Sequence, residues 1–193
     1  MEKRVLLIDD ERPTLNMFRL MLSAYGYHVL TAEGGDTGFD IFAAERPPLV
    51  ITDIKMPGMD GIELLKRVKE LDHRTEVIVV TGHGDMDLAI EALNLDATDF
   101  INKPVHRQAL EQALQRAEER IALARGKEEE ITLQDRAGAA VIQLKGNINS
   151  HSEPFLFAAY DQALALGRPL LVLHFEDSAS VNGAGVAILT QLL

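Results

Sequence analysis

The sequence contains no cysteine, few positive charges and no long apolar run. The absence of cysteine excludes disulfides, cysteine nucleophiles and thiolate metal sites, and it fits a reducing compartment. Only 19 Lys and Arg residues stand against 30 Asp and Glu, and the net charge of −11 argues against a nucleic-acid partner. The first apolar run, residues 5–8, is too short for a secretory signal, and no run is long enough to span a bilayer. We therefore expect a soluble, acidic, cytoplasmic protein with no nucleic-acid or membrane partner.

Short apolar runs alternate with helical patterns over residues 4–124. The runs predict strands at 4–8, 28–32, 49–52, 76–80 and 99–101. The intervening periodicity predicts helices at 12–24, 35–44, 61–71, 86–95 and 107–124. Five such units predict an α/β domain with a five-stranded, doubly wound parallel sheet and helices on both faces.

The last predicted helix of this domain carries Leu110, Leu114, Ala117, Ile121 and Ala124 at a spacing of three and four residues. This spacing is typical of a coiled-coil seam, and equally of a helix that covers its own sheet.

The charged stretch 125–130 is the only segment that resembles a linker, so we divide the chain into 1–124, a linker at 125–130, and 131–193. The last part predicts strands at 131–134, 139–144 and 170–175 and helices at 154–166 and 183–193, which is a smaller α/β segment. The sequence stops inside an apolar helical run. We therefore expect that further chain or another protein completes this segment.

Five polar side chains each lie beside a predicted strand end: Asp9, Asp10, Asp53, Thr81 and Lys103. In an open parallel sheet these carboxyl ends form one crevice, where ligands bind. Two carboxylates about 4 Å apart repel by roughly 4 kcal/mol at an effective dielectric constant near 20, so three require a cation or the protonation of one of them. Mg²⁺ with its oxygen ligands fits best. The pattern predicts a Mg²⁺-dependent site in which Asp53 accepts a phosphoryl group as an acyl phosphate while Thr81 and Lys103 hold its oxygens.

These residues, with Met56-Pro57-Gly58-Met59-Asp60-Gly61 and Lys103-Pro104, resemble the receiver domain of two-component response regulators. The resemblance covers residues 3–124. It implies that Asp53 takes the phosphoryl group from the phosphohistidine of a sensor histidine kinase. It also implies no enzymatic turnover beyond autocatalytic phosphoryl acceptance and dephosphorylation.

The same resemblance implies particular ligands and a switch. Asp10, Asp53 and the backbone carbonyl of Lys55 would bind Mg²⁺, with Asp9 acting through water. Thr81 would turn toward the phosphoryl group and Phe100 would swing inward behind it.

Two variable positions, Lys55 and His83, would flank the path of a hydrolytic water and set the lifetime of the phosphorylated state. Solvated loop residues without such a role are the equal alternative.

Residues 131–193 resemble part of a STAS domain, the fold of anti-sigma factor antagonists. The likeness rests on Gly146-Asn147-Ile148 and on the turn Val181-Asn182-Gly183-Ala184-Gly185-Val186. Gly183 stands where that family has its phosphorylated serine, so control through this turn is not expected, and Asn182 is predicted to cap the following helix. The resemblance implies a protein-interaction output, with an anti-sigma-type regulator as the downstream partner. A dimerisation domain that forms a homodimer is the alternative.

Two other functions compete with this reading. One is a Mg²⁺-dependent phosphohydrolase with an aspartyl-phosphate intermediate. It would need a general acid two residues after Asp53, where Lys55 is a poor proton donor at neutral pH. The other is a scaffold that never takes phosphate.

Overall fold

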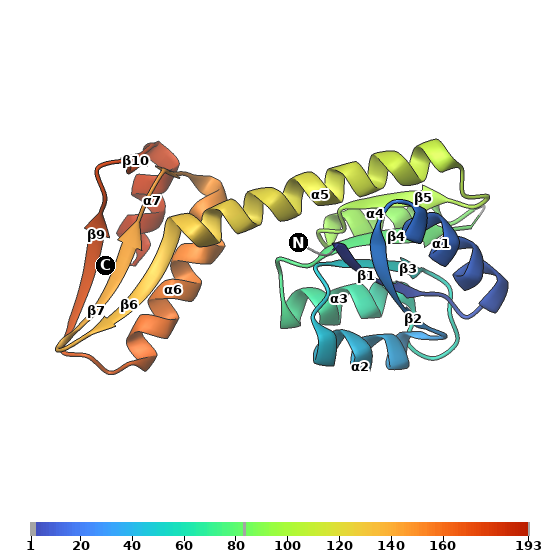
Figure 1. Cartoon of the computed structure of the whole chain (residues 1–193), viewed down its shortest axis with the longest axis horizontal. Helices are drawn as coiled ribbons and strands as arrows, with labels where there is room; N and C mark the ends of the chain where they lie inside the picture. The colour runs from blue at the N-terminus through green and yellow to red at the C-terminus, as the bar shows by residue number, and fades with distance from the viewer. Residues whose placement is uncertain (1–2, 83, 193) are drawn as a thin grey trace. The chain divides into compact units, whose positions relative to one another are not determined.

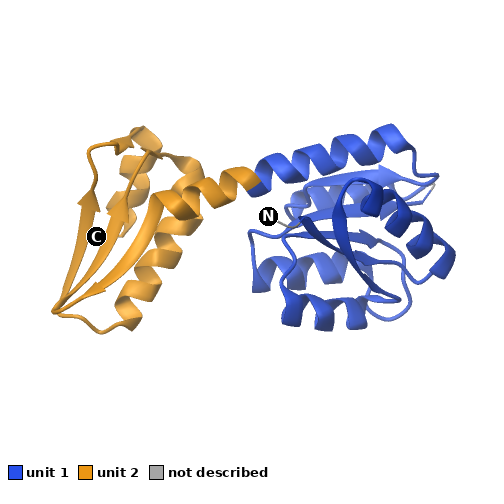
Figure 2. Ribbon diagram, viewed as in Figure 1, with its two compact units in different colours: residues 1–121 blue, residues 122–193 orange. Residues whose placement is uncertain are grey.

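Alternating strands and helices build the first part of the chain in the predicted order (Figure 1). The computed structural model describes residues 3–82 and 84–192, which divide into unit 1, residues 1–121, and unit 2, residues 122–193 (Figure 2). The strands of unit 1 are β1 (Lys3–Ile8), β2 (Tyr27–Ala32), β3 (Leu49–Asp53), β4 (Glu76–Thr81) and β5 (Asp99–Asn102). The helices that begin in this unit are α1 (Arg12–Ala24), α2 (Gly35–Glu45), α3 (Gly61–Leu71), α4 (Met86–Asn94) and α5 (Arg107–Glu130).

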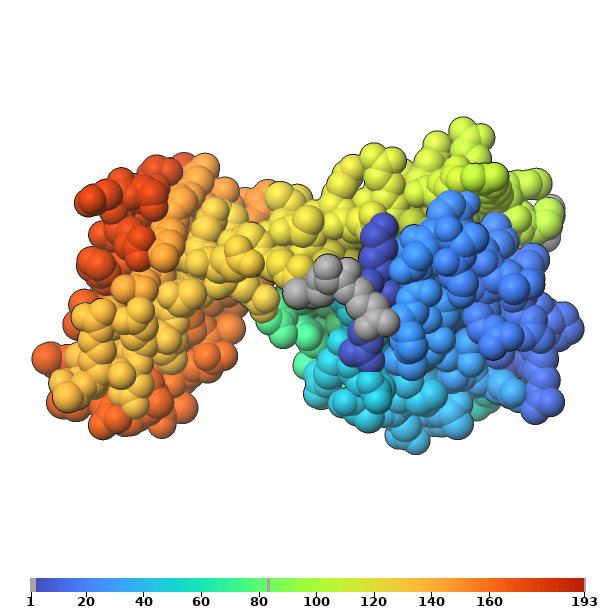
Figure 3. All heavy atoms as spheres, in the orientation of Figure 1, coloured from blue at the N-terminus to red at the C-terminus, as the bar shows by residue number. Residues whose placement is uncertain are grey.

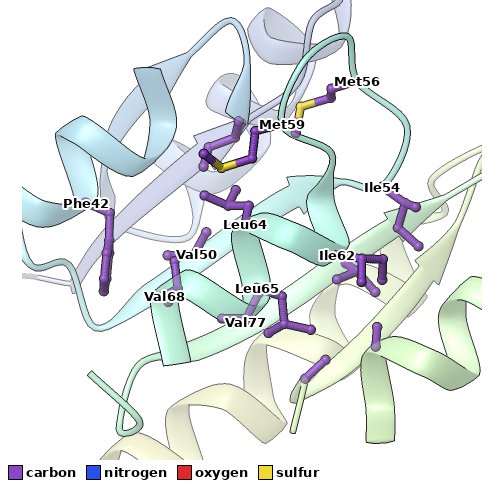
Figure 4. Packing of buried hydrophobic residues seen from close by; sticks show 14 of the residues in the cluster. Phe42, Val50, Ile54, Met56, Met59, Ile62, Leu64, Leu65, Val68 and Val77 are labelled. Atoms are coloured by element: carbon purple, nitrogen blue, oxygen red, sulfur yellow. The ribbon is translucent and has the colours of Figure 1, made fainter. Parts of the chain in front are cut away.

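The five strands form one parallel sheet in the order β2-β1-β3-β4-β5, which confirms the predicted fold class. Helices α2, α3 and α4 cover one face, where Phe42, Leu64 and Leu65 pack against Val50 and Val77 (Figure 4). Fully burying one such side chain stabilises the fold by about 1.5–3 kcal/mol. Because β1, β3 and β4 are buried on both faces, the positions of their carboxyl ends are fixed.

Helices α1 and α5 cover the other face of the sheet. Leu110, Leu114 and Ala117 of α5 are buried there, and Ile121 is partly buried against the same cluster. Of the two alternatives for this helix, a helix that covers its own sheet therefore holds for these residues. In the space-filling view, atoms of the blue, cyan and green segments of unit 1 lie against one another (Figure 3).

Helix α5 does not end near Ala124 but continues to Glu130, so the predicted linker 125–130 is helical. Lys and Glu are strong helix formers, and the single Gly126 costs only about 1 kcal/mol relative to alanine. The Nζ atom of Lys127 also donates to the carbonyl oxygen of Asn147 at 2.6 Å, so this last part of the helix is held by another residue of unit 2.

In unit 2, β6 (Ile131–Arg136) and β7 (Ala139–Leu144) form an antiparallel hairpin. Strand β9 (Leu170–Phe175) adds to β7 in parallel, giving the sheet order β6-β7-β9. The remaining elements are β8 (Asn147–Ile148), the 3-10 helix η1 (Ser150–Ser152), α6 (Glu153–Ala165), β10 (Ser180–Val181) and α7 (Gly183–Gln191). Ile142, Leu144, Ile148, Leu156 and Ile188 lie in the core of this unit.

No helix formed by residues 3–82 or 84–192 has the length and apolar character needed to cross a membrane.

Candidate functional site

Two buried carboxylates and one ammonium group meet at the carboxyl end of the unit 1 sheet. Asp9 directly follows β1 and is 2% exposed, and Asp53 is the last residue of β3 and is 7% exposed. The Nζ atom of Lys103, just after β5, lies 3.0 Å from Oδ1 of Asp53 and 3.2 Å from Oδ2 of Asp9. The other oxygen of Asp9, Oδ1, accepts the backbone N–H of Glu11 at 2.8 Å. The Lys103 ammonium group thus contacts both Asp9 and Asp53, the predicted acceptor.

Burial and the charge of the neighbouring partner shift the pKa values of Asp53 and Lys103 in opposite directions. Burial raises the pKa of the Asp53 carboxyl, the hydrogen bond and charge of Lys103 oppose that rise, and Asp9 and Asp10 add to it, so the net pKa is raised. Burial alone would lower the pKa of Lys103, but the hydrogen bond and charge of Asp53, with those of Asp9, outweigh it and raise the pKa. The site therefore combines a more basic carboxylate with a cation that stays charged.

The loop after Asp53 is folded tightly back over the end of β3. The backbone N–H of Gly61 donates to the carbonyl oxygen of Ile54 at 2.8 Å. A Cβ atom on Gly61 would meet the carbonyl oxygen of Asp53 and lie 2.9 Å from the Cα of Ile54, so no larger residue fits without movement. Asp60 caps α3 by accepting the N–H of Glu63 at 2.8 Å.

The two predicted switch residues are Thr81 and Phe100. Among the described residues, neither makes a hydrogen bond to the carboxylate of Asp9 or Asp53. Thr81 is 1% exposed, and its hydroxyl donates to Oδ1 of Asn102 at 2.7 Å. Phe100 is partly buried against the core cluster under α2, α3 and α4. The structure thus brings Asp9, Asp53 and Lys103 together and places Thr81 on the neighbouring strand with a different partner.

The carboxylates at this edge of the sheet have the chemistry that a Mg²⁺ site requires. Among the described residues, no group of three or more His, Cys, Asp or Glu side chains is arranged to hold a metal. Mg²⁺, however, retains several waters and needs only one or two protein carboxylates. Asp9 and Asp53 are buried and repelled by each other, and Asp10 is exposed but close enough to raise the pKa of Asp53. These oxygens fit a hard divalent cation.

Lys55 is held by a partner that the sequence did not reveal. Its Nζ atom lies 2.6 Å from Oδ1 of Asp85, whose other oxygen accepts the N–H of Gly82 at 3.2 Å. The lysine side chain is 65% exposed while that of Asp85 is 8% exposed. The Lys55 ammonium is therefore engaged with the loop after β4. His83, the other predicted lifetime residue, lies outside the described residues.

Asn102 and Asp85 are the polar residues of this region that sequence reasoning missed. Asn102 is the last residue of β5 and is paired directly with Thr81 across the two strands. The rule that found the other candidates, a polar residue at the carboxyl end of a strand, would also have found Asn102. Asp85 lies in the loop before α4, where it has the pattern of an ordinary helix-capping residue.

In unit 2 the turn before α7 has the predicted cap. Oδ1 of Asn182 accepts the N–H of Gly185 at 2.9 Å, and a Cβ atom on Gly185 would collide with the carbonyl oxygen of Ile148. Strand β10, which leads into this turn, pairs with β8. The turn is thus fixed against the strand that carries Asn147 and Ile148.

Comparison with known proteins gives consistent matches for the first part of the chain. The family model described as the response regulator receiver domain matches residues 5–115. Sporulation initiation phosphotransferase F of Bacillus subtilis (strain 168) is 38% identical over 104 residues, which are 54% of this chain and 84% of that protein. Transcriptional regulatory protein FixJ of Rhizobium meliloti (strain 1021) is 36% identical over 121 residues, which are 62% of this chain but only 59% of that protein. A solved receiver domain protein from Clostridium thermocellum superimposes with a TM-score of 0.60 and 38% identity, over 62% of this chain and 97% of that one.

Proposed function

This chain belongs to the response regulator receiver domain family of two-component systems, and from that premise we propose that Asp53 is its phosphoacceptor. Receiver domains are phosphorylated by sensor histidine kinases, so the donor would be a kinase phosphohistidine. The observation that carries the proposal is the buried Asp53 carboxylate at the end of β3, in contact with the Lys103 ammonium at 3.0 Å.

In the proposed reaction an oxygen of Asp53 attacks phosphorus and forms the P–O bond of an acyl phosphate. The P–N bond of the phosphohistidine breaks, and the imidazole nitrogen leaves with its electron pair and takes up a proton. The ionised carboxylate of Asp53 supplies the attacking oxygen, as in enzymes that form an aspartyl phosphate. Lys103 neutralises charge on the transferred group, and Asp9 keeps the ammonium group in place.

Asp10, Asp53 and the carbonyl oxygen of Lys55 would hold a Mg²⁺ ion, with Asp9 reaching it through water. When bound, the ion would neutralise charge on the phosphoryl oxygens and align them for in-line attack.

A phosphohydrolase is disfavoured by the state of Lys55. It occupies the place of the general acid two residues after Asp53, but its ammonium group is paired with Asp85 at 2.6 Å. The Nζ atom of Lys55 is therefore directed to the Asp85 carboxylate and is not placed to donate a proton to a leaving group on Asp53.

For unit 2 we propose a STAS-like module that binds a protein, with an anti-sigma-type regulator as the downstream partner. The hairpin β6–β7, the parallel strand β9 and the Asn182-capped helix α7 support this proposal. Exposed apolar side chains also support it, since Leu170, Val172 and Phe175 of β9 are 62%, 40% and 44% exposed. Apolar surface of this kind is typical of contact sites. The switch would reach unit 2 through α5, which has residues in both units.

Intact mass after incubation with Mg²⁺ and acetyl phosphate tests the acceptor. Wild type and Asp40→Asn, which removes an exposed carboxylate on α2, should each gain one phosphoryl group. Asp53→Asn should gain none. An adduct on Asp53→Asn, or none on wild type when hydrolysis is slow, would exclude Asp53 as acceptor.

Hydrogen exchange of residues 131–192, with and without the adduct, tests whether phosphorylation of unit 1 affects unit 2. Identical exchange in both states would refute this coupling.

A further inference from the structure

The buried hydroxyl of Thr81 is already committed in the unphosphorylated chain. Thr81 ends β4 and Asn102 ends β5, and the two residues are paired directly across the parallel strands. The hydroxyl donates to Oδ1 of Asn102 at 2.7 Å. The carbonyl oxygen of Thr81 accepts the N–H of Lys103 at 2.7 Å, so the backbone at this point is fixed as well.

A threonine hydroxyl has a single hydrogen and donates one hydrogen bond at full strength. If Thr81 is to donate to a phosphoryl oxygen on Asp53, its hydrogen must first leave Asn102. We propose that Asn102 is a positioning residue that retains the Thr81 hydroxyl in the resting state and thereby sets how readily Thr81 engages the phosphoryl group. This inference rests on the proposed phosphoacceptor function of Asp53.

The burial of the Thr81 hydroxyl explains why its acceptor, Asn102, matters. Thr81 is 1% exposed, so its hydroxyl has little access to bulk water and needs an acceptor within the protein. Among residues 3–82 and 84–192, every buried side-chain nitrogen or oxygen has a hydrogen-bond partner. Asn102 is itself exposed, which lets its amide move or be replaced without repacking the core. The competition is therefore between two acceptors for one hydrogen, with little change elsewhere.

The size of the effect follows from the strength of one neutral hydrogen bond. Losing such a bond shifts an equilibrium by roughly two- to tenfold. Asn102→Ala should therefore favour the state in which Thr81 faces Asp53 by that factor. Asn102→Asp keeps an oxygen at the same reach and should show no such gain.

The test uses the whole chain, Mg²⁺ and beryllofluoride, an inorganic mimic of the phosphoryl group. Affinity is measured by titration for wild type, Asn102→Ala, Thr81→Ala and the double variant. We expect Asn102→Ala to bind roughly two- to tenfold more tightly than wild type, and to have no effect in the Thr81→Ala background. The NMR signal of the Thr81 methyl group should also shift in Asn102→Ala without any ligand, which a change in metal binding alone would not produce.

The outcomes separate this inference from the proposed function. If wild type does not bind beryllofluoride, or Asp53→Asn binds it equally well, the phosphoacceptor proposal fails. If binding depends on Asp53 but Asn102→Ala changes nothing, the role of Asn102 is refuted alone. An equal effect of Asn102→Ala in wild type and in the Thr81→Ala background would also refute the role of Asn102.

Discussion

Replacing Gly61 by alanine should damage both the stability of unit 1 and phosphoryl acceptance. The added methyl group would lie against the carbonyl oxygen of Asp53, 3.0 Å from its carbonyl carbon and 2.9 Å from the Cα of Ile54. These are backbone atoms of a buried strand end, so they cannot rotate away as a flexible side chain would. Either α3 or the acceptor residue must shift.

The expected cost combines two opposing effects. Forcing an extra methyl group into a packed site costs about 1–3 kcal/mol. Alanine gains back about 0.5–1 kcal/mol because glycine loses more backbone freedom on folding. The net loss of roughly 1–2 kcal/mol lowers the folded-to-unfolded ratio about five- to thirtyfold. A displacement of about 1 Å at a reacting group slows a reaction by up to about 100-fold.

The stability of unit 1 would be measured by urea unfolding, monitored through the hydrogen exchange of β1 and β3. The rate of adduct formation with acetyl phosphate would measure phosphoryl acceptance. Gly34→Ala is the matched control, because its Cβ would meet open space and its backbone is extended. It should change stability by less than about 1 kcal/mol and leave the rate unchanged. If Gly61→Ala behaves like this control, the close approach of α3 to Asp53 has no role in holding the acceptor.

Three further changes have defined outcomes. The pKa of Asp53 is raised in the folded chain, so its ionised form opposes folding; Asp53→Asn should raise the melting temperature at pH 7, and the gain should shrink as pH falls through the folded pKa. A gain that grew on acidification would contradict that sign. Asn182→Ala removes the cap of α7 and should cost unit 2 about 1 kcal/mol in urea unfolding, with no effect on adduct formation. Gly126 lies within α5, and a Cβ atom added there would meet open space. Gly126→Ala should therefore stabilise the helix by about 0.5–1 kcal/mol, and destabilisation would argue against a continuous helix there.

Much of unit 1 was predictable because each strand is a short apolar run bounded by polar residues, and the end of each such run is visible in the sequence. Asp53, Thr81 and Lys103 were predicted in this way, and β3, β4 and β5 end within one residue of their predicted ends. The partners of these side chains were not predictable. Whether Thr81 donates to Asn102, or Lys55 pairs with Asp85, depends on rotamers and strand register that spacing alone does not specify.

The helical course of residues 125–130 was missed for a different reason. Glycine beside a charged run is typical of a linker, and the helix propensity of the Lys and Glu residues alone does not decide between a linker and a helix. Lys127 reaches the Asn147 carbonyl oxygen, which lies 20 residues further along the chain. Local composition contains no trace of such a contact.

The bridge from Lys103 to Asp9 joins residues 94 positions apart in the chain. It unites the first strand of the unit 1 sheet with the end of the last, and β5 pairs only with β4. Contacts of such long range form late, because chain entropy must be lost before they contribute. On the ribosome, a nascent chain that ends before Lys103 would contain Asp53, the proposed acceptor, but not the cation beside it. Under the proposed function, the chain would therefore become able to accept a phosphoryl group only when the whole sheet has folded.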